Sequence, residues 1–184
     1  MLEVISYIIV FIVAGATLVT GLLVGASIIA LAFTKVPFVP TPKKNVKIVI
    51  DQFELKPGQI FYDLGCGDGQ FLIEAESRGA KTIGFEVSPW AYAKGRFNLW
   101  RHKSQAKIIF KNFYDQNISE ADAVFCFLID TVMPKVEEKL KRELKLGAKI
   151  ISYGFTMPSW PPVKIVEIKK GNKRASKIYL YQKY

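Results

Sequence analysis

A carboxylate followed by three glycines at alternate positions is the clearest chemical signal in this chain of 184 residues. Asp63 lies near the end of the apolar run 60–64, and Gly65, Gly67 and Gly69 follow it. Such a run predicts a buried strand that enters a helix through a tight turn. Glycine is needed where φ is positive or where a ligand lies against the main chain. The N–H groups at the start of the next helix can then face that ligand. We expect a ligand-binding turn, with a ligand-free tight turn as the alternative.

The glycine spacing differs from two common phosphate-binding turns. Gln70 occupies the position of the third glycine in the dinucleotide pattern G-x-G-x-x-G, and the Lys-Ser/Thr pair of a P-loop is absent. The pattern Asp-x-Gly-x-Gly-x-Gly instead resembles motif I of the class I S-adenosylmethionine-dependent methyltransferases.

A second carboxylate ends the next apolar run. Glu86 closes the segment 81–86, 17 residues after Gly69. This separation is close to that at which an acidic residue binds ribose hydroxyls in doubly wound folds. Two carboxylates that each end a strand favour a nucleoside-type ligand more strongly than the glycines alone.

A helix should begin directly after this second carboxylate. Ser88 predicts its N-cap and Pro89 its first position. Trp90, in the first turn, is the aromatic residue expected to reach a ligand, whereas Phe97 and Trp100 are expected to pack in the core. The basic side of this helix carries Lys94, Arg96, Arg101 and Lys103.

Alternating strand-like and helix-like segments position these residues. Strands are predicted at 59–64, 81–86, 106–111, 123–129, 148–155, 163–168 and 177–181, with helices at 71–78, from Pro89, and at 137–144. Gly171-Asn172 predicts a hairpin between the last two strands. The fold class is therefore α/β: a doubly wound, mostly parallel seven-stranded sheet with a closing antiparallel hairpin and ligands at the strands' carboxyl ends.

An uncharged segment precedes this fold. Residues 4–34 contain no Asp, Glu, Lys or Arg, and about 20 apolar residues suffice to cross a bilayer. A cleaved signal peptide is the alternative, but it would begin with basic residues and have a shorter apolar core. The lysines that follow, from Lys35 to Lys47, predict a single-pass membrane protein with its catalytic domain on the cytoplasmic (or matrix) side.

A proline-containing linker follows the uncharged segment. Pro37 and Pro40 hold it extended, and Thr41-Pro42 predicts an N-cap and first position of a short helix. We expect three parts: an anchor at 1–34, a linker and helix at 35–57, and the catalytic domain at 58–184.

Composition limits the partners and chemistry. The net charge of +10 favours acidic partners such as nucleic acid or anionic lipid. Only two cysteines are present, which predicts neither a disulfide framework nor a metal site. His102, the single histidine, is expected to be a surface residue rather than a catalytic one.

Several motifs together resemble the small membrane-anchored protein-lysine methyltransferases that modify the ATP synthase c-subunit and the adenine nucleotide translocase, and their prokaryotic relatives. These motifs are Phe38-Val39-Pro40-Thr41, Asp63-Leu64-Gly65-Cys66-Gly67-Asp68-Gly69, Gly84-Phe85-Glu86-Val87-Ser88-Pro89-Trp90 and Phe155-x-x-Pro158-x-Trp160, all behind one membrane helix. The resemblance covers nearly the whole chain. It departs at Gln70, where the family usually has arginine.

The resemblance implies S-adenosyl-L-methionine as the cofactor, without a metal. Asp63 and the main chain of the turn would hold its amino-acid end, Glu86 its ribose, and Thr41 would support the methionine end. The cofactor-binding set implied in this way is Thr41, Asp63, Gly65, Cys66, Gly67, Gly69, Glu86, Val87, Asn112 and Phe113.

Asp130 lies at the usual acceptor position of this fold and is the predicted catalytic residue, orienting or deprotonating a lysine amine. Capping of the helix that starts at Thr131 is the alternative role. Tyr153, Phe155 and Trp160 are expected to wall the lysine channel or to pack in the core.

The expected partner is a lysine-bearing protein substrate, and the anchor favours a membrane protein. The anchor disfavours an RNA substrate, and the lack of an Asn/Asp-Pro-Pro-Tyr run at 128–131 disfavours methylation of DNA bases or of RNA amino groups, although not of ribose or ring carbons. The alternatives are an RNA methyltransferase, a lipid or quinone methyltransferase, and a non-catalytic cofactor-binding scaffold. The oligomeric state is not predicted.

Overall fold

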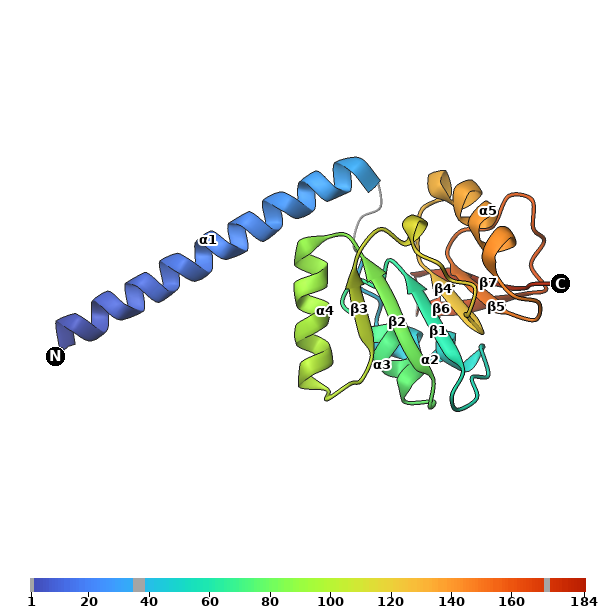
Figure 1. The fold of residues 1–184 in the computed structure, drawn as a ribbon, viewed down its shortest axis with the longest axis horizontal. Helices are drawn as coiled ribbons and strands as arrows, with labels where there is room; N and C mark the ends of the chain where they lie inside the picture. Colours follow the sequence, from blue (N-terminus) through green and yellow to red (C-terminus); the bar gives the residue numbers. More distant parts are fainter. Residues whose placement is uncertain (1, 35–38, 171–172) are drawn as a thin grey trace.

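The computed structural model describes residues 2–34, 39–170 and 173–184 and shows a long helix projecting from an α/β domain (Figure 1). The sheet has seven strands in the order β3-β2-β1-β4-β5-β7-β6. The strands are β1 (Ile60–Leu64), β2 (Lys81–Glu86), β3 (Lys107–Phe110), β4 (Ala123–Cys126), β5 (Lys149–Tyr153), β6 (Lys164–Lys170) and β7 (Lys173–Gln182).

The first five strands are parallel, and the sheet closes with an antiparallel pair. β1 pairs in parallel with both β2 and β4, whereas β7 lies antiparallel between β5 and β6. This arrangement confirms the predicted sheet and its closing hairpin. The predicted turn residues Gly171-Asn172 lie outside the described residues, as do Lys35, Pro37 and Phe38 of the predicted linker.

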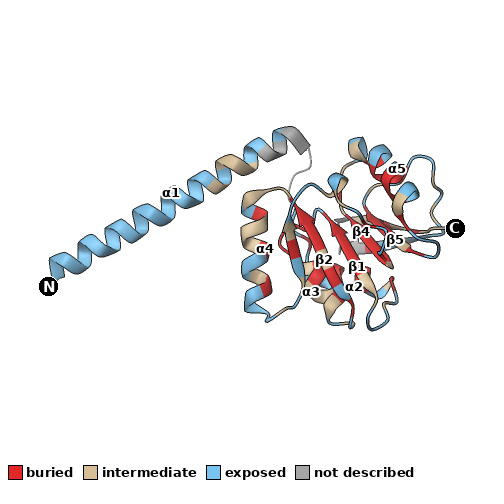
Figure 2. Cartoon of the chain, in the orientation of Figure 1, coloured by how far each residue is buried: buried red, intermediate tan, exposed pale blue. Residues whose placement is uncertain are grey.

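Helices cover both faces of the sheet. They are α1 (Leu2–Thr34), α2 (Lys43–Asp51), α3 (Gln70–Glu76), α4 (Pro89–Arg101) and α5 (Met133–Glu143), with short 3-10 helices η1 (Phe113–Asp115) and η2 (Asp130–Val132). Side chains of α2, α3 and α4 share one buried cluster with one face, and α5 packs into a second cluster on the other. Burial is concentrated in the strands between these layers (Figure 2).

Glycines allow the turn after β1 to lie close to its neighbours. Gly65, Gly67 and Gly69 have φ of +86°, +53° and +75°, where other residues are strained. A Cβ on Gly95 of α4 would lie 2.8 Å from the carbonyl oxygen of Gly67, and one on Gly84 of β2 would lie 2.6 Å from Sγ of Cys66. The absence of side chains at Gly84 and Gly95 therefore allows β2 and α4 to lie directly against the turn.

Two of the predicted helix starts have different outcomes. Oγ of Ser88 accepts a hydrogen bond from the Ala91 N–H, which confirms the cap of α4. The prediction that Thr41 caps α2 is wrong, because α2 begins at Lys43 and the Pro42 carbonyl accepts from the Asn45 N–H. Thr41 is instead buried in the domain.

The expectation that Phe97 and Trp100 pack in the core is also wrong. Their exposed fractions are 55% and 74%. The reason is helical phase: the inward side of α4 is occupied by Ala91, Gly95 and Leu99, and this narrow stripe brings the helix against the sheet. The two rings lie together on the outside, with centroids 5.7 Å apart.

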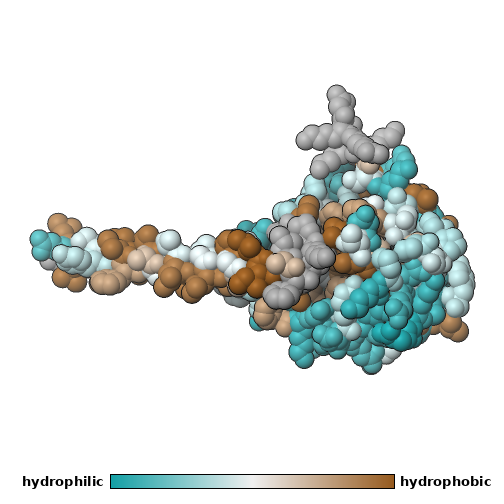
Figure 3. Space-filling model, turned by 90° about the horizontal axis from the view of Figure 1, so that it is seen from above, coloured by the Kyte–Doolittle hydropathy of each residue, from teal (hydrophilic) through white to brown (hydrophobic). Residues whose placement is uncertain are grey.

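Helix α1 is apolar and largely exposed. Within α1, the segment Leu2–Ile29 is long and apolar enough to cross a membrane, with a mean hydropathy of 2.5. Figure 3 shows this apolar surface extending from a largely hydrophilic domain. One such helix is only a weak indication of a membrane anchor, because a signal sequence has the same properties.

Candidate functional site

A cavity of about 680 Å³ lies at the carboxyl ends of the parallel strands. This is where ligands bind in doubly wound sheets. Its lining includes Asp63, Gly65, Cys66, Gly67, Asp68 and Gln70 from the first turn; Glu86, Val87, Ser88 and Trp90 after β2; Lys111, Asn112, Phe113 and Tyr114 after β3; Phe127, Leu128, Thr131, Val132 and Lys135 after β4; Val39 and Thr41 from the linker; and Val24, Ser27 and Ile28 from α1.

Backbone N–H groups hold the Glu86 carboxylate in place. Oε2 accepts from the Gly67 N–H at 2.8 Å, and Oε1 accepts from the N–H groups of Val87 and Ser88 at 2.8 and 2.7 Å. The carboxylate therefore joins the glycine turn after β1 to the end of β2. Since a carboxylate has about four acceptor positions, it retains capacity to accept from a ligand hydroxyl.

Asp63 is the most unusual group in the cavity. It is 1% exposed, and neither carboxylate oxygen has a hydrogen-bond partner among the described residues. Burial, together with the nearby carboxylates of Glu86 and Asp68, raises the pKa of Asp63 well above its ordinary value. Because a buried unpaired carboxylate is costly, this site fits a ligand that brings its own positive charge or N–H donors.

Gln70 contacts Asp68 on the same turn. Its Nε2 donates to Oδ1 and Oδ2 of Asp68 at 3.2 and 3.0 Å. Lys94 of α4 places its Nζ 3.4 Å from Oδ2, and Asn98 donates to the Asp68 carbonyl at 2.9 Å. The positive charge beside this turn is thus supplied by α4, whereas residue 70 contributes a neutral amide.

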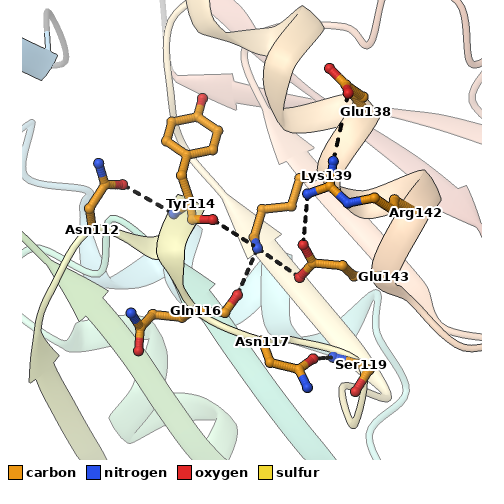
Figure 4. A network of polar contacts seen from close by, with 9 residues as sticks. All are labelled: Asn112, Tyr114, Gln116, Asn117, Ser119, Glu138, Lys139, Arg142 and Glu143. Atoms are coloured by element: carbon orange, nitrogen blue, oxygen red, sulfur yellow. Dashed lines mark hydrogen bonds and ion pairs between the residues drawn. The ribbon is translucent and has the colours of Figure 1, made fainter.

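A polar network supports the opposite wall (Figure 4). Nζ of the buried Lys139 donates to the carbonyls of Tyr114 and Gln116 at 3.3 and 2.6 Å and pairs with Glu143 at 2.7 Å. Oδ1 of Asn112 accepts from the Tyr114 N–H at 3.1 Å. These contacts fix η1, so the segment that carries Phe113 and Tyr114 into the cavity is held from α5.

Tyr114 closes this wall beside a cation. Nζ of Lys135 lies 4.3 Å from the centroid of its ring. Burial raises the pKa of Tyr114 to about 12. The phenol therefore remains neutral at physiological pH and provides an aromatic surface rather than a general base.

Helix α1 contributes directly to the cavity. Oγ of Ser27 accepts from the Ser88 hydroxyl and from the Trp90 N–H, both at 3.0 Å, and the Ser27 hydroxyl donates to the Leu23 carbonyl at 2.8 Å. All the hydrogen-bonding capacity of this hydroxyl is therefore used. The sequence reasoning missed α1 here, because Ser27 is one of several hydroxyl residues in an otherwise apolar segment.

The structure separates the predicted site residues into two groups. Nine of the ten cofactor-binding candidates line the cavity: Thr41, Asp63, Gly65, Cys66, Gly67, Glu86, Val87, Asn112 and Phe113. Gly69 does not; a Cβ there would lie 2.8 Å from Cδ1 of Leu99, which indicates a packing role. Burial raises the pKa of the Cys66 thiol, so it is not an activated nucleophile.

The acceptor-side candidates lie outside the cavity lining. Asp130 is exposed at the start of η2, and its Oδ1 accepts from the Thr131 N–H at 2.8 Å, while Thr131 itself lines the cavity. Tyr153 is a core residue whose hydroxyl accepts from Asn45. Phe155 and Trp160 pack against the second core cluster rather than walling the cavity.

Neither a metal centre nor a catalytic histidine emerges. Across residues 2–34, 39–170 and 173–184, no group of three His, Cys, Asp or Glu side chains is placed to hold a metal ion. His102 is exposed at the end of α4, with Nδ1 2.8 Å from the Asn98 carbonyl oxygen. The cavity therefore offers carboxylates, backbone N–H groups and aromatic surfaces.

Known proteins are similar to this chain in sequence and in fold. The ANTKMT methyltransferase domain matches residues 63–164. A protein-lysine N-methyltransferase of Saccharolobus islandicus is 33% identical over 150 residues, covering 79% of this chain and 92% of that protein. The lysine N-methyltransferase of the ATP synthase c-subunit from Rattus norvegicus is 33% identical over 154 residues, covering 82% of this chain and 71% of the relative.

A solved structure extends this similarity to the fold. The RNA methyltransferase of Salinibacter ruber, in complex with S-adenosyl-L-homocysteine, superimposes with a TM-score of 0.72 at 28% identity. The match covers 78% of this chain and 93% of that one. Family match, relatives and fold agree: this chain belongs to the ANTKMT methyltransferase family, among the class I S-adenosylmethionine-dependent methyltransferases.

Proposed function

We propose that this protein transfers a methyl group from S-adenosylmethionine to a lysine side chain of a membrane protein. The observation that carries the proposal is that one cavity contains both the buried Asp63, which has no hydrogen-bond partner among the described residues, and Glu86, which is held by backbone N–H groups. The family supplies the reaction class, and its named members support lysine as the acceptor.

The lining residues fit the cofactor's chemistry. Asp63 would pair with the ammonium group of the methionine end, near the main chain of Gly65, Cys66 and Gly67 and with Thr41 at the same end. Glu86 would accept from the ribose hydroxyls. When bound, S-adenosylmethionine supplies an electrophilic methyl group on a sulfonium.

The adenine would lie between apolar and aromatic groups. Val87, Asn112 and Phe113 border this part of the cavity, and Tyr114 continues the wall. Lys139 of α5 holds η1 in place by hydrogen bonds to carbonyl groups in and directly after it. These side chains can therefore form the adenine-binding surface before a ligand arrives. Such prearranged walls reduce the ordering cost of binding.

The acceptor lysine must arrive as a neutral amine. Its ordinary pKa of about 10.4 leaves it charged at neutral pH, so desolvation or a carboxylate must assist. We assign this role to Asp130, which begins η2 directly beside the cavity-lining Thr131. The protein's remaining contribution is alignment of the amine and exclusion of water.

The anchor limits the acceptors that reach this cavity. Val24, Ser27 and Ile28 of α1 line it, so a membrane crossed by α1 would lie beside the active site. The exposed lysines Lys43, Lys44 and Lys47 favour the cytoplasmic (or matrix) side for the domain. A lysine close to the surface of a membrane protein therefore fits best.

Transfer of labelled methyl groups tests the proposal. Full-length protein is incubated with membranes and methyl-labelled S-adenosylmethionine, and protein, lipid and RNA are then separated. The expected result is label in protein, recovered as methyl-lysine after hydrolysis, and lost with Glu86→Ala. Glu167→Gln, at an exposed position in β6, is the matched control. Label confined to lipid or RNA would overturn the lysine assignment.

Two observations support the RNA alternative. The similar solved structure is that of an RNA methyltransferase, and the chain carries a net charge of +10. The fractionation above separates the two assignments directly. Calorimetry with S-adenosylhomocysteine, combined with the transfer assay, separates an enzyme from a scaffold. An enzyme would show both binding and transfer, whereas a scaffold would bind without transfer.

A further inference from the structure

The outer side of α4 has an unusual composition for a domain surface. Trp90, Phe97 and Trp100 have exposed fractions of 41%, 55% and 74%. Their spacings of seven and three residues place them along one side of the helix. Arg96 and Arg101 are exposed on the two flanks of this stripe. We call these five residues the α4 outer face.

The chain segment that carries this face contains only basic charged residues. Residues 87–114 contain six Lys or Arg and no Asp or Glu. Lys94 lies 3.4 Å from Asp68 of the cofactor cavity, whereas Arg96, Arg101 and Lys103 are exposed in the same segment as the aromatic stripe. Aromatic side chains between basic ones are typical of helices that lie in the interface of an anionic bilayer.

Helix α4 also lies in the right place for such contact. It is on the side of the domain from which α1 projects, and it runs across α1 rather than along it (Figure 1). Ser27 of α1 is hydrogen-bonded to Ser88 and Trp90 at the start of α4. A bilayer crossed by α1 would therefore face the outer side of α4.

The length of α1 agrees with this geometry. Val24, Ser27 and Ile28 line the cavity, and Ser27 is hydrogen-bonded to the start of α4, so the membrane-crossing part would lie before Val24. Residues 2–23 span about 33 Å, which is enough to cross a hydrocarbon core of about 30 Å. The last turns of α1 can thus belong to the catalytic domain while the rest crosses the bilayer.

We infer that the α4 outer face rests on the anionic lipid surface beside α1, with its aromatic rings at the headgroup level and its arginines on lipid phosphates. The inference rests on the proposed anchoring by α1 and adds a second, peripheral contact. Two contacts would hold the domain in one orientation and keep the mouth of the cavity at a defined height above the bilayer. Arginine suits phosphate through its paired N–H donors.

Quenching of Trp100 by brominated lipid tests this contact. Full-length protein and its Trp100→Phe variant are placed in nanodiscs with phosphatidylserine, with and without bromine on the acyl chains. The difference between the two emissions is the share of Trp100. We expect bromine to reduce that share about twofold, as for an interfacial side chain.

Two controls make the result specific. Leu146→Trp in the Trp100→Phe background places an exposed indole before β5, at the part of the sheet remote from α4, and its emission should not change. The quenching of Trp100 should be stronger in anionic than in zwitterionic nanodiscs, and Arg96→Gln/Arg101→Gln should reduce this difference in quenching. Lys56→Gln/Lys81→Gln, which changes the same charge at two other exposed lysines, should leave that difference intact.

Failure of this inference can be told apart from failure of the proposed function. Protein that stays with the nanodisc while Trp100 remains unquenched overturns the α4 contact alone. Protein that leaves the nanodisc overturns the anchor and the contact together. Trp100 shielded from aqueous acrylamide but not reached by bromine would indicate a protein partner and would also overturn the inference. Binding of S-adenosylhomocysteine, measured on the same samples, reports separately on the enzyme.

Discussion

The hydroxyl of Ser88 donates a hydrogen bond of 3.0 Å to Oγ of Ser27, and this bond joins the apolar helix α1 to the first turn of α4. Ser88 follows Glu86 by two residues, and its N–H donates to the Glu86 carboxylate. Helix α1 is therefore two hydrogen bonds away from the group proposed to hold the cofactor's ribose. This connection makes α1 part of the site.

Replacement of Ser27 tests this connection. Ser27→Ala removes the acceptor of the Ser88 hydroxyl and the Trp90 N–H, and leaving polar groups unpaired costs about 1–3 kcal/mol where they are buried. We expect the affinity for S-adenosylhomocysteine to fall about three- to tenfold, measured by calorimetry on the full chain in detergent.

Thr17→Ala is the matched control for that change. Its hydroxyl donates only to the Val13 carbonyl within α1, so the affinity should remain that of the unaltered protein. Equal losses from both substitutions would contradict a specific role of Ser27 and would indicate a general effect on α1.

Asp63→Asn should separate stability from binding. Because burial holds the pKa of Asp63 above its unfolded value, its stabilising contribution is present below the unfolded pKa and is lost as the pH rises through the folded one. Once the pH is above the unfolded pKa, the buried carboxyl destabilises the ligand-free fold relative to a neutral amide, so the amide should raise the melting temperature, by an amount corresponding to about 1–3 kcal/mol. Cofactor binding should nevertheless be lost.

Asp122→Asn provides the opposite sign. Burial raises the pKa of Asp122, but bonds from Lys145 and the Ile60 N–H outweigh it, so that pKa is lowered. Its contribution is present above the unfolded pKa and lost as the pH falls. The amide should therefore lower the melting temperature while binding persists, and a thermal scan of both variants would expose a wrong sign in either case.

The same carboxyl of Asp63 predicts a pH dependence of binding. Only ionised Asp63 can pair with an ammonium group, and its raised pKa means that protons compete with the ligand. Affinity for S-adenosylhomocysteine should therefore increase as the pH rises through the raised pKa of Asp63. Calorimetry in buffers of different ionisation heat should detect proton release on binding at pH values below that pKa. A flat profile would contradict the assignment of Asp63 to the ammonium group.

Lys94 and Gln70 should be coupled through Asp68. Lys94→Ala removes the cation beside the glycine turn, and we expect a two- to fivefold loss of cofactor affinity, about the effect of a partly exposed ion pair. Gln70→Arg places a guanidinium next to the same carboxylate, so Lys94→Ala should cost less in that background. Additive effects in this double-mutant cycle would contradict a shared role.

Asp130→Asn tests the acceptor side. If Asp130 assists the lysine amine, the variant should lose about 10²- to 10⁴-fold in kcat while the affinity for S-adenosylhomocysteine stays unchanged. The defect should shrink as the pH rises, because the amine then loses its proton without assistance. A defect independent of pH would favour the capping role that the Thr131 N–H contact indicates. Asp115→Asn, in η1, is the control for charge.

Much of the fold could be read from local patterns. Apolar strands, glycine turns and the Ser88-Pro89 cap depend on residues close in sequence, and β2 occupies the predicted segment 81–86. The pair Asp63 and Glu86 also follows from topology, since both lie near the carboxyl ends of neighbouring parallel strands, which meet at one sheet edge.

Other features depend on packing between distant segments. The direction of Phe97 and Trp100 was wrong in the sequence prediction because an aromatic residue on a helix can face either the core or the outside, and here the small Gly95 lets the opposite side approach the sheet. The position of Thr41 depends on where the preceding linker meets the domain. Gln70 became interpretable only when α4 placed Lys94 beside the same carboxylate.

Residue order alone thus determined the fold class, the two carboxylates and the apolar segment, because each is encoded by periodicity, spacing or composition within a short stretch. Tertiary structure decided that the end of this apolar segment forms a wall of the glycine-turn cavity. It also decided that a neutral Gln70 is accompanied by a cation from α4. These are contacts between segments about 60 and 25 residues apart, and such contacts are set by how the helices pack on the sheet, which no local pattern records.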